Sequence, residues 1–232
     1  MPPRILAFEC VARTASACMV ADGGELAYAD LGGGEAEQGL TSLLDGLIRQ
    51  HGSPSALAVA AGPGSFTGLR IATVTARTLA WLENCPVHAV DALAALAAER
   101  GDGLWWVLVP LKKDTTFHGL FQVSAGLVTT LQATAPDLDA GQSSLHPLTN
   151  QATAIGPGLT AKPGLAQRWC PGIAEGDPAA LTARGVARLA PQVAAQSWSS
   201  VLPAYHQTPA PVLQREAELL RRATLTSTPG IL

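Results

Sequence analysis

The sequence contains little charge and few aromatic side chains. Asp, Glu, Lys and Arg make up 14% of the 232 residues, and Phe, Trp and Tyr only 5%. The 15 basic residues are dispersed among 18 acidic ones, which leaves a net charge of −3 and no basic run of the kind that binds nucleic acid directly. With 47% hydrophobic residues, the sequence predicts a folded protein with apolar surface left for a partner to cover.

Metal-binding and membrane-spanning patterns are missing from the sequence. Cys10, Cys18, Cys85 and Cys170 have no C-x-x-C spacing, and the five histidines have no metal-site spacing, so each histidine is expected to be a solitary surface or loop residue. No apolar run approaches the roughly 20 residues of a membrane span, and no signal-peptide core precedes the first apolar segment. We expect a soluble protein of the reducing cytoplasm that binds no membrane.

A glycine-rich turn is the most informative segment. It joins an apolar strand at residues 56–61 to a helix at 65–84, and residues 62–70 read G-P-G-S-F-T-G-L-R. Such turns present backbone N–H groups that often bind phosphate. However, the P-loop needs a lysine that is missing here, and the dinucleotide pattern needs its third glycine one residue before Gly68. The hydrolase elbow needs a glycine where Pro63 stands, so the turn fits none of the three templates.

The order of strands and helices is repeated along the chain. Apolar runs and glycine turns predict strands at residues 4–10, 16–21, 26–31, 56–61 and 87–90, and helical periodicity predicts helices at 40–49, 65–84 and 91–100. A second series of strands is expected at 104–111, 117–124, 127–132 and 153–155, with a loop before the last one. The sequence G-P-G at 156–158 then echoes residues 62–64. This repetition predicts two related α/β lobes that meet near residues 101–103, followed by an extended tail at 191–211 and a short helix at 213–222.

The long helix at 65–84 has two distinctive faces. One is a stripe of small residues, which permits close approach to a sheet or to another helix. Its members recur every four positions: Gly68, Ala72, Ala76 and Ala80. The other face carries Arg70, Thr73, Arg77 and Trp81. The tryptophan could be a core residue whose neighbouring arginines are solvated, or the three side chains could form an interface hot spot. The sequence leaves both interpretations open.

Four polar residues stand at the ends of predicted elements. Ser65 and Thr67 lie where their hydroxyls could cap the long helix or bind an anion, and capping is favoured. Asp91 is expected to cap the helix at 91–100. Glu9 ends the first strand, where side chains of open α/β folds face a cleft, but we expect an ordinary exposed carboxylate. No local pair of acidic residues indicates general acid/base chemistry.

The glycine turn and its flanks resemble the bacterial TsaB (YeaZ) family. The family turn comprises Gly62, Pro63, Gly64, Ser65, Phe66, Thr67, Gly68, Leu69 and Arg70. Agreement extends over about residues 4–100, and Pro203-Ala204-Tyr205 is similar to the family's C-terminal motif. The sequence departs from the family at Glu9-Cys10, at Gly39-Leu40 and around residues 110–113, and these departures argue against nucleotide handling by this chain.

The resemblance implies an actin-like (ASKHA) α/β fold of two RNase H-like lobes, each a mixed sheet with flanking helices. We expect an N-terminal lobe at residues 1–101 that carries the turn and the partner-binding helices. A C-terminal lobe is expected at 102–196, and a Pro-rich tail with a short C-terminal helix at 197–232.

The resemblance also implies a non-catalytic subunit. Family members partner the catalytic subunit TsaD, with the ATPase TsaE, in forming threonylcarbamoyladenosine at position 37 of ANN-decoding tRNAs. By this resemblance the chain holds no cofactor, ATP and metal belong to the partner subunits, tRNA is reached only through the complex, and the chain alone could form a homodimer. Two adjacent helices can complete a four-helix bundle with a partner. That interface is expected at Leu40, Leu44, Arg70, Thr73, Ala76, Arg77, Ala80 and Trp81.

Two other functions stay open. A nucleotide-binding enzyme could use the Gly62-x-Gly64 turn with Asp91, 27 residues after Gly64, as the acid that binds ribose. Against it, three strands and a helix precede this turn, whereas a Rossmann turn follows the first strand. A protease acting on its partner is the second alternative, although no Ser/His/Asp or metal motif supports it.

Overall fold

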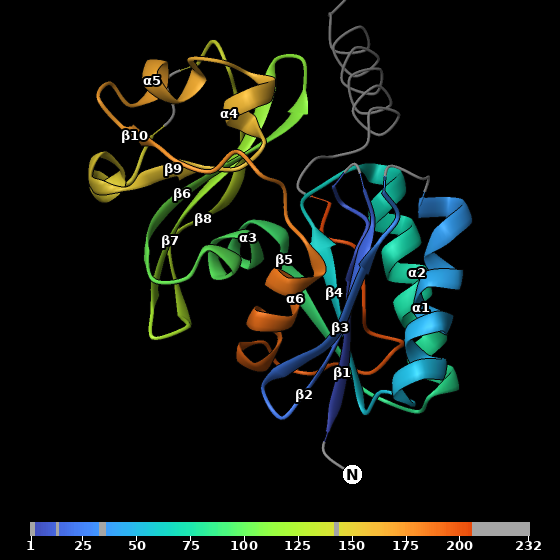
Figure 1. Cartoon of the computed structure of the whole chain (residues 1–232). Helices are drawn as coiled ribbons and strands as arrows, with labels where there is room; N and C mark the ends of the chain where they lie inside the picture. The colour runs from blue at the N-terminus through green and yellow to red at the C-terminus, as the bar shows by residue number, and fades with distance from the viewer. Residues whose placement is uncertain (1–2, 13, 33–35, 142–143, 206–232) are drawn as a thin grey trace, which may run out of the picture.

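The computed structural model describes residues 3–12, 14–32, 36–141 and 144–205. These residues form two five-stranded mixed sheets with helices packed against them. Figure 1 shows the sheets as two lobes with helices lying between them. The two predicted α/β lobes are therefore present.

The first sheet is a three-stranded meander extended by two parallel strands. Its elements are β1 (Arg4–Glu9), β2 (Ser16–Ala21), β3 (Gly24–Asp30), α1 (Ala36–His51), β4 (Ala56–Gly62), α2 (Phe66–Leu82), β5 (Val87–Asp91) and α3 (Ala92–Arg100). The strand order is β3-β2-β1-β4-β5, with β1, β4 and β5 parallel. Because β4 is covered on both faces, its sequence is apolar without alternation.

The second sheet repeats this topology. Its elements are β6 (Gly103–Lys112), β7 (Thr115–Ser124), β8 (Leu127–Leu138), β9 (Thr153–Ile155), α4 (Gly158–Ala161), α5 (Leu165–Trp169), β10 (Ala174–Glu175) and α6 (Ala183–Leu189). The order β8-β7-β6-β9-β10 matches that of the first sheet strand for strand. The repeat inferred from the shared G-P-G turn is confirmed.

The second lobe differs from expectation in two places. Residues 133–138 were expected in a loop, but β8 continues through them to Leu138. Pro136 is tolerated there because β8 is an edge strand. Where the first lobe has the 17-residue helix α2, the second has only α4 and α5, of four and five residues.

Each lobe ends in a helix that packs on the other lobe's sheet. Helix α3 contacts β6, β7 and β8, and α6 contacts β1, β2 and β4, while α3 and α6 pack on each other. Residues 92–98 are buried all round, and five of these seven are alanine, which allows close approach on every side. One apolar core therefore runs through both lobes.

The chain then returns to the first lobe along an extended path, as expected of the tail. Gln196 exchanges backbone hydrogen bonds with Val87 at the start of β5, and Ala204 donates to the carbonyl of Ala61 at the end of β4 at 2.7 Å. Val201, between them, is fully buried in the first lobe's core. The short helix expected at 213–222 lies outside the described residues, and the residue limits of the three parts stay predictions.

None of the described helices is long and apolar enough to cross a membrane.

Candidate functional site: the glycine turn and the outer face of α2

The glycine turn connects the end of β4 to the start of α2. Ser65 Oγ accepts a hydrogen bond from the N–H of Gly68 at 2.9 Å, which confirms its capping role. The next side chain, Phe66, is exposed and stacks on Tyr205 with ring centroids 5.1 Å apart. The Arg70 guanidinium lies 5.3 Å from the same Phe66 ring. The outward side of the turn is thus an aromatic and cationic surface.

The inward side of the turn is packed against the chain itself. A Cβ on Gly62, whose φ is +140°, would lie 2.6 Å from the carbonyl oxygen of Ala204. A Cβ on Gly68 would overlap the carbonyl oxygen of Cys10 in the loop after β1. These glycines are therefore explained by the close approach of two other segments, the β1–β2 loop and the returning tail.

Glu9 is fully buried, so the expectation that it is an exposed carboxylate is wrong. Its carboxylate accepts hydrogen bonds from the N–H groups of Val11 and Ala12, at 3.0 and 3.1 Å, and from Ser16 Oγ at 2.9 Å. Burial raises the pKa of Glu9 from 4.5 to about 7, against the opposing effect of these three donors. The carboxylate at the end of β1 thus holds its own loop in place.

The same hydrogen bonds continue into the other lobe. Ser16 Oγ also accepts from the N–H of Ala183, the first residue of α6. Glu99, near the end of α3, accepts from both the N–H and the hydroxyl of Thr182, at 3.0 and 2.7 Å. The polar groups beside the turn therefore join the two lobes.

Asp91 caps α3, as expected. Its Oδ1 accepts from the N–H groups of Leu93 and Ala94, at 2.8 and 2.9 Å, and from the hydroxyl of Thr134 at 3.2 Å. The carboxylate that the nucleotide-binding alternative assigned to a ribose is engaged in these contacts.

The small-residue stripe of α2 faces inward. Ala72, Ala76 and Ala80 are fully buried in the first lobe's core, where α2 packs on β4. Five of the eight positions expected at the partner interface have their side chains buried inside the lobe: Leu40, Leu44, Thr73, Ala76 and Ala80. The stripe sets the distance between the helix and the sheet.

The other three expected positions lie on the outer face of α2. Arg70 and Trp81 are exposed, and Arg77 is partly exposed. Phe66 and Val74 complete this face at a spacing of four residues around Arg70, and Leu82 lies at its end. Val74, Trp81 and Leu82 are each 62% exposed. Sequence reasoning missed Phe66, Val74 and Leu82 as surface residues, although their four-residue spacing around Arg70 could have revealed the first two.

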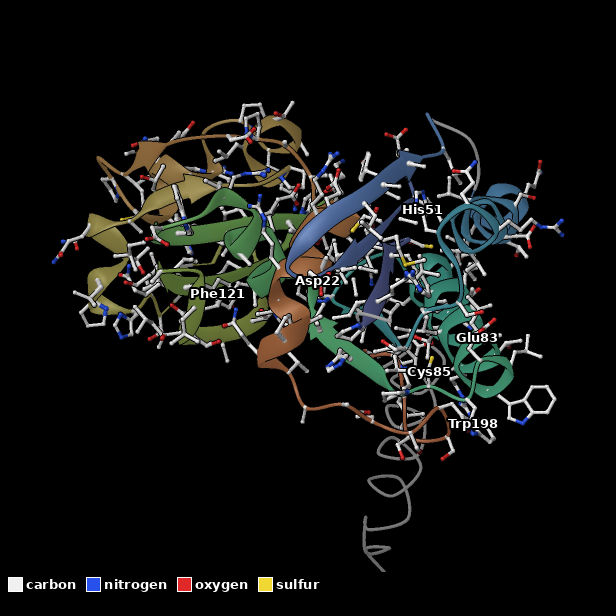
Figure 2. The ribbon with its side chains drawn as sticks, turned by 60° about the horizontal axis from the view of Figure 1, so that its bottom comes forward. Asp22, His51, Glu83, Cys85, Phe121 and Trp198 are labelled. Atoms are coloured by element: carbon white, nitrogen blue, oxygen red, sulfur yellow. The ribbon has the colours of Figure 1, made fainter. Side chains whose placement is uncertain are left out.

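A groove of about 500 Å³ runs beside this outer face. It is lined by Val74, Arg77, Thr78, Trp81 and Trp198. Figure 2 shows Trp198 on the same side of the molecule as Glu83, the C-cap residue that follows α2. No local pattern could have predicted Trp198 here, because the returning tail carries it more than 100 residues along the chain.

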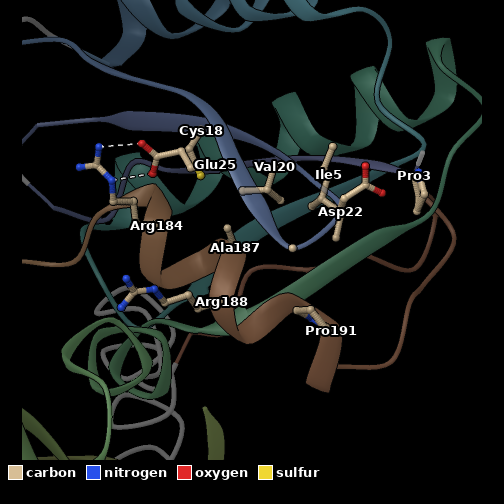
Figure 3. A pocket seen from close by; sticks show the side chains of 12 residues that line it. Pro3, Ile5, Cys18, Val20, Asp22, Glu25, Arg184, Ala187, Arg188 and Pro191 are labelled. Carbon is tan, nitrogen blue, oxygen red and sulfur yellow. Dashed lines mark hydrogen bonds and ion pairs between the residues drawn. The ribbon is translucent and has the colours of Figure 1, made fainter. Parts of the chain in front are cut away.

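A second cavity, of about 530 Å³, lies between α6 and the meander of the first sheet (Figure 3). Glu25 and Arg184 form a bidentate ion pair at its edge, with N–O distances of 2.7 and 3.0 Å, and the Arg184 guanidinium lies 3.7 Å from the centre of the Tyr28 ring. Burial raises the pKa of the Cys18 thiol in its wall to about 12, so the thiol stays protonated. Glu25 and Arg184 at this cavity are thus paired with each other.

The expectation that every histidine is a solitary surface or loop residue is wrong for His118. It is fully buried on β7, where Nε2 lies 2.8 Å from Oδ2 of Asp137 and Nδ1 accepts from Trp106 Nε1 at 3.4 Å. Both ring nitrogens therefore have partners. Within the described part of the chain, no group of three or more His, Cys, Asp or Glu side chains could hold a metal ion.

Comparisons with known proteins agree with this architecture. A family model described as "TsaD: tRNA N6-adenosine threonylcarbamoyltransferase" matches residues 40–103, from α1 to the start of β6. Among curated proteins, the chain is 40% identical over 85 residues to the "tRNA threonylcarbamoyladenosine biosynthesis protein TsaB" of Bacillus subtilis strain 168. The match spans 36% of this chain and 36% of that protein, so it covers about a third of the curated relative.

Two solved structures from Pseudomonas aeruginosa share the whole fold. The structure titled "YeaZ from Pseudomonas aeruginosa" has a TM-score of 0.73 at 22% identity, over 88% of this chain and 99% of that chain. A second, described as an uncharacterized protein "with similarity to peptidase YEAZ", has a TM-score of 0.74 at 22% identity, over 88% of this chain and all of the other. This likeness confirms the predicted actin-like fold of two lobes.

Proposed function

We propose that the chain, which is similar to the TsaB (YeaZ) family in its first lobe and in its fold, is a non-catalytic subunit in the formation of threonylcarbamoyladenosine on tRNA. In this role it supports a TsaD-type threonylcarbamoyltransferase, together with TsaE, and carries out no chemical step itself. The TsaD family model that matches its residues 40–103 is in keeping with descent from a fold shared with that partner.

The observation that carries this proposal is that the polar groups at the carboxyl end of the first sheet are engaged within the chain. Ligands of open α/β sheets bind outside the carboxyl ends of the parallel strands. At that place the Glu9 carboxylate is occupied by Val11, Ala12 and Ser16, and the turn is packed against Cys10 and Ala204. A cavity of about 390 Å³ borders this edge at Ala12 and Ser16, but the carboxylate beside it is engaged by internal donors. A chain whose groups at this edge are engaged in this way is suited to act by binding other proteins.

The outer face of α2 is the surface that we assign to TsaD. It places Phe66, Val74 and Trp81 beside Arg70 and Arg77, and aromatic residues and arginine are enriched where binding energy concentrates. Helix α1 lies against α2 and can contribute its own exposed residues. In isolation the same face could join two copies of the chain about a two-fold axis.

We further propose that tRNA is reached only through the assembled complex in the cytoplasm. The net charge of −3 offers little phosphate neutralisation, which is the main source of non-specific affinity for nucleic acid. ATP and metal are assigned to the partner subunits.

Calorimetric titration with the TsaD protein of the same organism tests the assigned surface. We expect Trp81→Ala to weaken binding about tenfold or more, because buried tryptophans are frequent hot spots. Leu127→Ala is the matched control, since Leu127 is a 60% exposed apolar residue at the start of β8 in the other lobe. Equal affinities for the wild type and both variants would refute the surface, and no binding of the wild type at micromolar concentrations would refute the partnership.

A further inference from the structure

The cavity between α6 and the meander of the first sheet is set apart from the surface assigned to TsaD. Helix α6 packs on β1, β2 and β4, and the core cluster on its side of the sheet differs from the one that holds α2. Figure 1 shows α6 and α2 on opposite sides of this sheet. The cavity volume of about 530 Å³ lies within the range of about 300–1,000 Å³ that is typical of small-molecule sites. A ligand in this cavity would therefore not contact the outer face of α2.

The floor of the cavity is apolar. Ile5 on β1 and Val20 on β2 line it from the sheet, and Ala187 lines it from α6. The Cys18 thiol in the wall donates a hydrogen bond to the carbonyl oxygen of Ala183 at 3.3 Å, so it carries no charge. This floor suits the hydrocarbon part of a ligand, because the transfer of apolar groups out of water is favourable.

One end of the cavity carries more positive than negative charge. Figure 3 shows Arg184 and Arg188 at this end and Asp22 at the opposite end. Glu25 is the carboxylate between the two arginines: its hydrogen bonds with Arg184 lower its pKa most, and the nearby charge of Arg188 lowers the pKa further. Two guanidinium groups and one carboxylate leave a charge of +1 at this end of the cavity.

Both arginines are held in place and keep hydrogen-bond donors to spare. Arg184 donates from Nε and Nη2 to Glu25 and lies over the Tyr28 ring, which leaves its Nη1 without a partner among the described residues. Arg188 donates from Nη1 to the carbonyl oxygen of Glu99 at 2.6 Å, and its Nε and Nη2 have no partner in the same part of the chain. Guanidinium groups that are already ordered lose less side-chain entropy when they bind an anion. A charge of +1 matches a carboxylate better than a dianionic phosphate.

We propose that this cavity binds a small carboxylate with a short apolar chain. The carboxylate accepts hydrogen bonds from Arg184 and Arg188, and the chain lies along the apolar floor. Asp22 repels the carboxylate from the opposite end, which favours this single orientation. Because one wall belongs to α6 and the other to the meander, the ligand contacts both and stabilises their packing. This site goes beyond the proposed function and does not depend on it.

Titration of the isotope-labelled full-length chain with octanoate, followed by NMR, tests the site. We expect the amide signals of residues 18–25 and 184–188 to shift, with a dissociation constant of about 1 mM or lower. Octanol has the same chain without the charge, and acetate has the charge without the chain. Each should bind at least about tenfold more weakly than octanoate, because each loses one of the two contributions.

Two substitutions test the two parts of the site. Arg188→Gln removes the excess charge and Val20→Phe fills the floor, so each should weaken octanoate binding about fivefold or more. Arg49→Gln on α1 and Leu26→Phe on β3 are the matched controls, since both residues are exposed and lie outside the cavity lining. Both controls should bind octanoate as the wild type does.

Several results would overturn the site. They are the absence of shifts up to about 10 mM octanoate, equal affinity for octanol or acetate, shifts confined to α2, and unchanged binding by either cavity variant. If Val20→Phe fails to fold, the comparison of the three probes on the wild type and the effect of Arg188→Gln still decide. These titrations contain no partner protein, so their failure is distinct from a failure of the proposed function.

Discussion

At the scale of single residues, Glu9 decides what the end of β1 can do. A carboxylate at a strand end could bind a ligand, and its position in the sequence fits that role. The fold instead gives it three internal donors and no exposure. The sequence alone could not reveal this, because Ser16 and the backbone of residues 11 and 12 meet Glu9 only once the β1–β2 hairpin has formed.

The raised pKa of Glu9 predicts a specific pH dependence of stability. Folding raises this pKa from 4.5 to about 7, so the contribution of Glu9 is fully present below pH 4.5 and is lost as the pH rises through 7. Relative to Glu9→Gln, which cannot ionise, the wild type should lose roughly 3 kcal/mol of unfolding free energy between pH 4.5 and pH 8. Urea unfolding of both proteins across this range measures it. Parallel pH profiles, or a wild type that gains stability with pH, would contradict the assigned environment.

Gly68 is the residue at which the turn tolerates no side chain. Since a Cβ there would overlap the Cys10 carbonyl oxygen, we expect Gly68→Ala to cost about 1–3 kcal/mol through forced backbone movement. Gly46→Ala in α1 is the control, because no atom lies within 4 Å of its added Cβ, and it should stabilise by about 0.5–1 kcal/mol. Thermal unfolding of both variants compares the two effects, and equal shifts would show that the turn is not closely packed.

At the scale of elements, helix α2 shows how far periodicity can predict structure. Its limits, its Ser65 cap and its stripe of small residues all followed from local sequence. The local sequence did not show which neighbour the stripe packs against, because a sheet and a partner helix both require small side chains at these positions. The position of Trp198 beside the outer face of α2 could not be predicted either, because it depends on the path of the tail.

Substitutions on the two faces of α2 should differ strongly in their effect on stability. Ala80→Glu places a charge in a site with no exposed surface, so we expect a loss of more than about 3 kcal/mol or an unfolded chain. Thr78→Glu, two residues away and exposed, should change stability by no more than about 0.5 kcal/mol. Circular dichroism and urea unfolding distinguish them. An Ala80→Glu variant with native stability would mean that the stripe is not packed on the sheet.

At the scale of the whole molecule, the duplicated topology was predictable and the exchange of helices was not. The two G-P-G turns and the shared order of elements indicated two related lobes, and the strand orders of the sheets agree. Helices α3 and α6 cross to the opposite sheets, and nothing in the small apolar residues of these short helices specifies which of two similar sheets each helix covers. The length of β8 was missed because Pro136 interrupts the strand pattern without ending an edge strand.

The measurement that tests the account most directly is a reconstitution with TsaD, TsaE, the enzyme that supplies threonylcarbamoyl-adenylate, and tRNA, with this chain present or omitted. We predict that threonylcarbamoyladenosine forms in the complete mixture, is lost when the chain is omitted, and does not form when the chain alone is given the adenylate and tRNA. Undiminished product in the omission arm, or product from this chain alone, would contradict a required but non-catalytic subunit.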